Sequence, residues 1–262
     1  MRNLRLVFAA LVVATAPVLA GPREDAAAAY RRQDYTAALE LFRPLATRGD
    51  ATAQYRLGLM YANGRGVPKD YQQAASWYRK AADQGHDFAQ TSLAIMYALG
   101  EGMPKDDQQA AYWLRKAADQ GYAGAQGLLG DLYAGGRGVP KDDQQAAYWL
   151  QKAADQNDAS AQLQIGHLHS SGKGVPKDDE QALSWYRKAA DQGNANAQFV
   201  LGSWYAYGRG VPKDDQQAYF WWLLASVSGD TSMIKRRDSI ESQISPQQRA
   251  AAQADARNWK PR

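Results

Sequence analysis

The chain has 262 residues, no cysteine, 45% hydrophobic residues and a formal charge of +4. Without cysteine there is no disulfide, so packing alone must stabilise the fold. The positive charge is concentrated in residues 231–262, which hold seven Lys or Arg against three Asp or Glu, and the region before them is close to neutral. Binding to a phosphate backbone requires a basic stripe. The composition therefore argues against nucleic acid as a partner.

The first twenty residues have the three parts of a secretory signal peptide. Two arginines precede residues 6–16, an apolar run broken by one threonine, and Val18 and Ala20 are small residues suited to a cleavage site. The apolar run is shorter than the roughly 20 residues that a transmembrane helix needs. We expect cleavage after Ala20 and a mature chain that is periplasmic or secreted, without an integral membrane span.

A five-residue motif recurs at a fixed interval of 36 residues. Gly-Val-Pro-Lys-Asp, or Gly-Met-Pro-Lys-Asp in the second case, begins at Gly66, Gly102, Gly138, Gly174 and Gly210. Five tryptophans keep the same register: Trp77, Trp113, Trp149, Trp185 and Trp221. A fixed period of this length is typical of a solenoid. We therefore divide the chain into five units, 51–86, 87–122, 123–158, 159–194 and 195–230.

Each unit is predicted to contain two antiparallel helices. In unit one the first helix spans 51–63 and ends at Gly64, because glycine readily adopts the left-handed conformation of a C-terminal cap. Asp70 is then expected to cap the second helix, with Gln73 as the reciprocal member of a capping box. Apolar residues at i, i+3, i+4 and i+7 from Ala74 form one helical face. The predicted fold is an all-α, elongated solenoid.

The two ends of the repeat array are expected to act as caps. Residues 21–50 resemble a degenerate half-repeat, with Asp34 at the helix cap and Gly49 at its end. Residues 231–262 are predicted to hold two further helices, 231–243 and 246–258, in a C-terminal helical cap. A solenoid needs such polar ends for solubility.

Candidate catalytic and metal-binding groups are few. His167 and His169 lie two residues apart on a predicted helix, so their side chains diverge, and His86 lies at a turn between units. The chain has no Gly-x-Ser-x-Gly nucleophile elbow, and its Gly-Arg-Gly segments lack the Gly-Lys-Ser/Thr ending of a phosphate loop. Tryptophans can stack on carbohydrate, but their single repeated slot favours burial. We expect no catalytic residue, metal or cofactor.

The first helix of each unit has a constant face and a variable stripe. Positions 3, 4, 7, 8 and 11 hardly change between units, whereas positions 2, 5, 6, 9 and 13 change freely and also share one face. Drift on a free surface is one explanation, but large apolar residues in the stripe favour a binding interface. The predicted partner-binding residues are Tyr55, Arg56, Leu59, Phe88, Ile95, Leu128, Asp131, His167, Phe199 and Tyr207.

The repeat resembles a known family. Residues 53–85 read Ala-x-x-x-Leu-Gly-x-x-Tyr-x-x-Gly-x-Gly-Val-Pro-x-Asp and then Ala-x-x-Trp-Tyr-x-Lys-Ala-Ala-x-x-Gly, a pattern similar to the Sel-one-like (SLR) repeat, a relative of the tetratricopeptide repeat. The resemblance implies a right-handed superhelical solenoid whose first helices line the concave face. It also implies a non-catalytic adaptor that binds another protein.

Several functions are compatible with this resemblance. Exported relatives include immunity proteins that neutralise lipase effectors of type VI secretion, and these are similar to the chain in export and repeat pattern. The preferred expectation is therefore a periplasmic immunity protein with a secreted lipase as its partner. The alternative is a regulator or scaffold of envelope or exopolysaccharide machinery. A wall-active or β-lactam hydrolase ranks last, because the paired cysteines of the branch linked to β-lactams are missing here.

The signal peptide gives the first prediction. Because the Arg-rich start, apolar run and small residues before Gly21 match a cleavage site, N-terminal sequencing of the exported protein should begin at Gly21. A product that retains Met1 and stays attached to the membrane would refute the predicted localisation.

Overall fold

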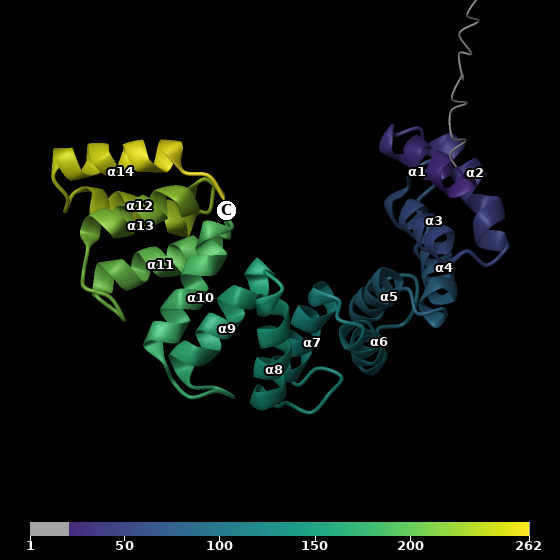
Figure 1. The fold of residues 1–262 in the computed structure, drawn as a ribbon, viewed down its shortest axis with the longest axis horizontal. Helices are drawn as coiled ribbons and strands as arrows, with labels where there is room; N and C mark the ends of the chain where they lie inside the picture. The colour runs from purple at the N-terminus through teal and green to yellow at the C-terminus, as the bar shows by residue number, and fades with distance from the viewer. Residues whose placement is uncertain (1–20, 262) are drawn as a thin grey trace, which may run out of the picture.

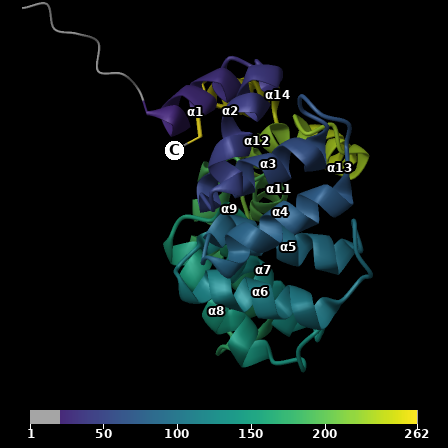
Figure 2. The ribbon, with the colours of Figure 1, turned by 90° about the vertical axis from the view of Figure 1, so that its right-hand side faces the viewer.

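The computed structural model of the chain describes residues 21–261, so the predicted signal peptide lies outside the described residues. Between these limits the chain forms fourteen α-helices and no strand. Figures 1 and 2 show the helices stacked in chain order along an open arch. The predicted all-α solenoid is confirmed. Among the described helices, none has the length and apolar character needed to cross a membrane.

Ten helices form five consecutive antiparallel pairs. The pairs are α3 (Ala51–Asn63) with α4 (Tyr71–Asp83), α5 (Asp87–Leu99) with α6 (Asp107–Asp119), α7 (Ala123–Gly135) with α8 (Asp143–Asp155), α9 (Ala159–Ser171) with α10 (Asp179–Asp191), and α11 (Ala195–Tyr207) with α12 (Asp215–Ser226). Figure 1 shows α5, a first helix, on the inner side of the arch and α6 outside it. The first helices therefore face the concave side in this part of the molecule.

Local sequence signals set the helix ends as expected. Gly64 has φ 66° and ψ 36°, the left-handed cap predicted for the end of α3. The Asp70 carboxylate accepts the backbone N–H groups of Gln72 and Gln73 at 2.9 and 3.0 Å. The reciprocal bond from Gln73 does not form; its side chain is exposed to water instead, and the complete capping box of the described residues is that of Ser245 and Gln248.

The glycine that begins each five-residue motif allows adjacent units to approach closely. Gly138 has φ 68°, and a Cβ atom at this position would overlap the carbonyl oxygen of Asp107 at the start of α6. The loop of one unit therefore packs on the preceding unit's second helix, and only glycine provides both the backbone conformation and the space.

A row of buried glutamines joins successive units. Gln126 donates through Nε2 to the carbonyl oxygen of Ala118 in the preceding unit at 3.1 Å. Its Oε1 accepts from Nε2 of Gln156, at the end of its own unit, at 2.8 Å. Gln54, Gln90 and Gln162 make the equivalent pair of bonds. The row fixes how each unit sits on the one before it.

The tryptophan slot is buried in four of the five units. Trp113, Trp149, Trp185 and Trp221 are buried, which confirms the core-face prediction for them, whereas Trp77 is half-buried. The guanidinium of Arg79 lies 5.1 Å from the ring centre of Trp113, so the preceding unit helps to cover that ring. The ammonium group of Lys80, on the same helix, lies 4.1 Å from the ring centre of Trp77, and equivalent lysines lie over Trp113, Trp149 and Trp185.

The two ends differ from the repeat. Residues 21–50 form a complete helix pair, α1 (Pro22–Arg31) and α2 (Tyr35–Thr47), where the sequence predicted a half-repeat. The first of these was missed because its buried face consists of two alanines, Ala26 and Ala29. At the other end α13 (Thr231–Glu241) and α14 (Pro246–Asn258) both pack against α12, so they do not continue the stacking of pairs.

The glutamine row gives a stability prediction. Gln126→Leu removes two buried hydrogen bonds and should lower the free energy of unfolding by about 1–3 kcal/mol. Denaturant unfolding of the variant and the wild type measures this change. The matched control is Gln144→Leu, an exposed glutamine in α8, which should change stability by no more than about 0.5 kcal/mol. Equal losses in the two variants would show that the row does not stabilise the interface.

Candidate partner-binding surface

Large apolar side chains are exposed on the first helices. Phe88 and Ile95 on α5 are 45% and 41% exposed, and Leu128 on α7 is 36% exposed. Leu99, which is 64% exposed, lies on the same variable stripe although the sequence analysis did not select it. Phe88, Ile95 and Leu99 follow one another at i, i+7 and i+11, so they form one apolar face of α5.

An aromatic cluster extends from this face across the first two units, up to the start of α7. The ring of Phe88 lies 6.0 Å from that of Tyr55 on α3 and 4.7 Å from that of Tyr122, which precedes α7. The imidazole of His86 stacks on Tyr55 at 4.8 Å. Two predicted residues are therefore brought together, and two that the sequence analysis missed join them.

Arg56 continues the surface toward the N-terminal cap. Its guanidinium lies 5.6 Å from the ring of Tyr30 on α1 and 6.0 Å from that of Tyr55. Tyr30 was not predicted, because the whole of α1 was missed. A cationic side chain thus borders the aromatic cluster at one end.

His86 and Tyr122 occupy a slot that other units use to cap a helix. The residue before the first helix is Asp50, Asp158 or Asn194 in three units, and each accepts a backbone N–H. His86 keeps this role through Nδ1, at 3.3 Å from the nitrogen of Ala89, and burial lowers the pKa of its imidazole. Tyr122 makes no capping bond. Loss of Asp or Asn at two successive caps was the signal that sequence reasoning overlooked.

The variable stripe of α7 is rich in glycine. Gly124, Gly127 and Gly135 occupy three of its five positions. A Cβ atom on Gly127 would meet only the Cβ of Ala153, at 4.0 Å, and one on Gly135 would reach Arg137 at an ordinary 3.6 Å. Internal packing therefore does not require glycine at these two positions, although each costs the helix about 0.5–1 kcal/mol relative to alanine.

Beyond Leu128 the stripe becomes polar. Asp131 is half-buried, and this burial raises the pKa of its carboxyl group, against smaller opposing effects of Gln164 and Arg137. On α9, Nδ1 of His167 lies 2.8 Å from the Tyr186 hydroxyl, and partial burial lowers the pKa of the imidazole, which favours its neutral form at pH 7. His169 is buried in the slot held by tyrosine in other units.

Three of the predicted residues contribute to packing as well. Phe199 is half-buried, with its ring 6.2 Å from that of Trp222, and Leu59 is half-buried against the core. Tyr207 is 69% exposed, although its hydroxyl accepts a hydrogen bond from Arg236 of α13 at 3.1 Å. The exposed aliphatic side chains of the stripe, Ile95, Leu99 and Leu128, lie on α5 and α7.

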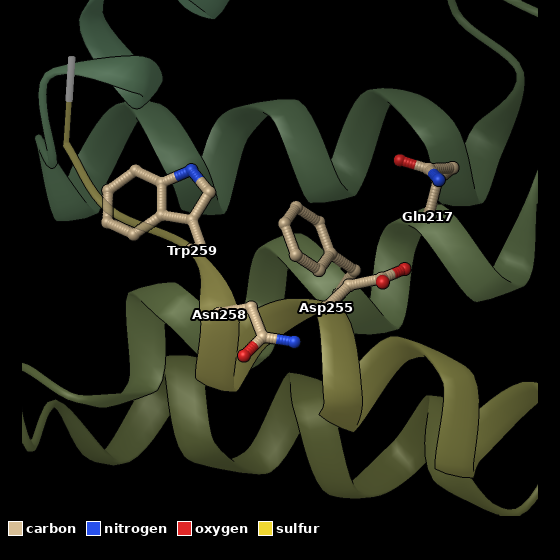
Figure 3. A pocket seen from close by; sticks show the side chains of 5 residues that line it. Gln217, Asp255, Asn258 and Trp259 are labelled. Atoms are coloured by element: carbon tan, nitrogen blue, oxygen red, sulfur yellow. The ribbon is translucent and has the colours of Figure 1, made fainter.

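The C-terminal cap contains a cleft of about 310 Å³ between α12 and α14. Figure 3 shows Asp255, Asn258 and Trp259 around it, with Gln217 on the opposite helix, and Phe220 completes the lining. The lining provides one carboxylate and no histidine, serine or lysine to form an acid–base pair with it. Across residues 21–261, no three His, Asp or Glu side chains are grouped so as to hold a metal ion.

The repeat is identified by comparison with known proteins. The model of the Sel1 repeat matches residues 28–50, 51–86, 87–122, 123–158, 159–194 and 195–230. The chain belongs to the Sel1 repeat family. This repeat is a protein-interaction fold, so binding of another protein is the function expected of the solenoid.

Solved structures of Sel1 repeat proteins are similar over most of the chain. One from Oxalobacter formigenes is 35% identical, with a TM-score of 0.78, over 90% of this chain and 99% of that one. A protective antigen of uropathogenic Escherichia coli with an SLR fold is 33% identical, with a TM-score of 0.80; the match covers 90% of this chain and 53% of the antigen, so the chain spans about half its length.

A third structure shares the fold at lower identity. An immunity protein from Pseudomonas aeruginosa is 21% identical, with a TM-score of 0.51, over 87% of this chain and 84% of that one. Comparison with curated proteins gives no match.

The difference between Phe88 and Phe199 can be tested without a partner. Phe88→Ala should lower the free energy of unfolding by less than about 1 kcal/mol, because nearly half of this side chain is already in water. Phe199→Ala should lower it by about 2–3 kcal/mol, because the ring packs on the C-terminal core. Denaturant unfolding of both variants is the measurement. A larger loss for Phe88 than for Phe199 would mean that Phe88 is a packing residue.

Proposed function

We propose that the chain is a periplasmic immunity protein, which binds a secreted lipase effector on the concave side of its solenoid and blocks it without catalysis. The main support for this binding surface is the apolar face of α5, where Phe88, Ile95 and Leu99 are exposed in one stripe. Contiguous exposed apolar side chains on a soluble protein are typical of interaction sites.

The shape of the molecule supports a protein as the ligand. A large partner can contact several units at once along an arch, whereas a small molecule needs an enclosed pocket. The aromatic cluster around Phe88 and Tyr122 supplies the kind of side chains that dominate interface energies. These features favour a macromolecular partner over a substrate.

The features of residues 1–20 support a location outside the cytoplasm, where a secreted lipase would meet its inhibitor. An immunity protein of Pseudomonas aeruginosa has the same fold, so the fold is compatible with this role.

The proposal is tested by protection from a lipase. Type VI lipase effectors from the same genome are exported one at a time to the periplasm of Escherichia coli, with and without the full chain. We expect one effector whose toxicity the chain abolishes, and whose phospholipase activity on vesicles the purified chain blocks at equimolar amounts. A chain without residues 1–20 should remain in the cytoplasm and should not protect.

The same assay tests the surface. Phe88→Ala should weaken inhibition by at least about 1 kcal/mol, roughly a fivefold or larger increase in the inhibition constant. Gln144→Ala, on the second helix α8, should leave inhibition unchanged. If the chain leaves every such lipase active, the immunity role is wrong; specific binding to a component of the envelope machinery would then identify it as a scaffold.

A further inference from the structure

Asp131 is a half-buried carboxylate without an ion-pair partner in the described part of the chain. The ion pairs between residues 21 and 261 do not include it, and the closest influence of opposite charge is Arg137, which lies too far away to pair. Removing a carboxylate from water is unfavourable unless a cation or hydrogen bonds compensate. Within the described residues Gln164 stabilises the charged carboxylate in part, but no cation pairs with it.

Two further carboxylates lie near Tyr122, and one of them also lies near Asp131. Asp158, the cap of α9, is near enough to Asp131 to raise the pKa of its carboxyl group further. Asp87 and Asp158 both act on the hydroxyl of Tyr122, whose pKa is raised mainly by burial. Tyr122 in turn contacts Phe88. A negative region therefore adjoins the exposed apolar face of α5.

The glycines of α7 leave access to this region. Gly127 is one turn before Asp131 on the same face, and the space where its side chain would lie is open except for Ala153. Gly135 extends the open face toward the end of the helix, whereas the ring of Tyr122 covers Gly124 at its start. A long side chain from another protein can lie along this backbone and reach the Asp131 carboxylate.

We infer that the surface formed by the variable stripes of α5 and α7 binds a partner segment that carries apolar side chains next to an arginine or lysine. The apolar side chains pack on Phe88, Ile95 and Leu128, and the basic group forms an ion pair with Asp131. Charge complementarity selects this occupant, because an exposed apolar face lies beside Asp131, a carboxylate without an ion-pair partner in the described residues. The inference specifies the binding site of the proposed function and rests on it for the identity of the natural partner.

A random peptide library is a probe that does not depend on that identity. The purified exported chain is panned against a phage-displayed library of random dodecapeptides, and the enriched sequences are read. We expect peptides with Arg or Lys within a few residues of Leu, Phe or Trp. One enriched peptide is then synthesised and titrated by calorimetry against the wild type and variants.

The variants distinguish loss of the ion pair with Asp131 from a general effect on folding. Asp131→Asn should raise the Kd of the peptide about tenfold, as expected for a partly buried charge pair. The control Asp119→Asn changes an exposed carboxylate at the end of α6 and should leave the Kd unchanged. Asp131→Arg should abolish binding, and replacing the basic residue of the peptide by Glu should restore it. A charge reversal that rescues binding cannot come from misfolding.

Several results would overturn the inference. These are a library that enriches no sequence class, enriched peptides without a basic residue, and equal Kd values for Asp131→Asn and wild type. A wild-type dimer that dissociates in Phe88→Ala would show that a second copy of the chain covers this surface instead. If a lipase is inhibited equally by Asp131→Asn and wild type, the proposed function stands and this inference fails. If the peptide results hold but no lipase is inhibited, this inference stands and the proposed function fails.

Discussion

The side-chain amide of one buried glutamine in each unit determines how the solenoid stacks. Units of a solenoid contact only their neighbours, so each interface must specify its own register. Gln126 does so by donating to Ala118 of the preceding unit while it accepts from Gln156 of its own. An apolar side chain would fill the same volume, but it would tolerate sliding, whereas a buried amide is satisfied in one register alone.

Close packing inside each pair imposes a second constraint. A Cβ atom on Gly58 would lie 2.5 Å from the ring of Tyr78, and one on Gly202 would lie 2.6 Å from that of Trp222. Four of the five units have glycine at this position, and the second has Ala94, so nearly the same small residues recur on the packing face. The opposite face of the first helix has no such requirement, so its residues are free to follow whatever the protein binds.

Local signals made the repeated part of the fold predictable. Gly64 ends α3 and Asp70 caps α4 through contacts within a few residues, which a sequence pattern captures directly. The ends were less predictable because their helices depend on tertiary packing. The apolar contribution of α14 is a single buried residue, Ala252, so its position on α12 could not be inferred. Phe199 occupies a variable position of its helix, but its ring also packs on the C-terminal core. That core is not part of the repeat, so the repeat pattern could not predict this contact.

Much of the surface could be predicted too, but its centre could not. The variable register identified Tyr55 and Phe88, whereas His86 and Tyr122 lie at the cap slot, outside the positions counted as helical. Their importance is visible only when the rings are seen in contact across units. Sequence periodicity assigns residues to a face; it does not show which neighbouring turns contribute to that face.

Residues that destabilise a helix, such as interior glycines and a missing side-chain cap, are not spread evenly over the solenoid. The helix α7 lacks a side-chain cap at Tyr122 and has glycines at positions where packing does not require them, while α9 keeps the cap bond of Asp158 to Ala161. Neutral drift would distribute such losses among the units, yet they coincide with the exposed apolar face of the adjacent α5. A solenoid tolerates one weak unit because the interfaces on both sides support it. The local loss of stability is therefore best explained by binding at α5 and α7, where sequence rules that favour folding are broken together.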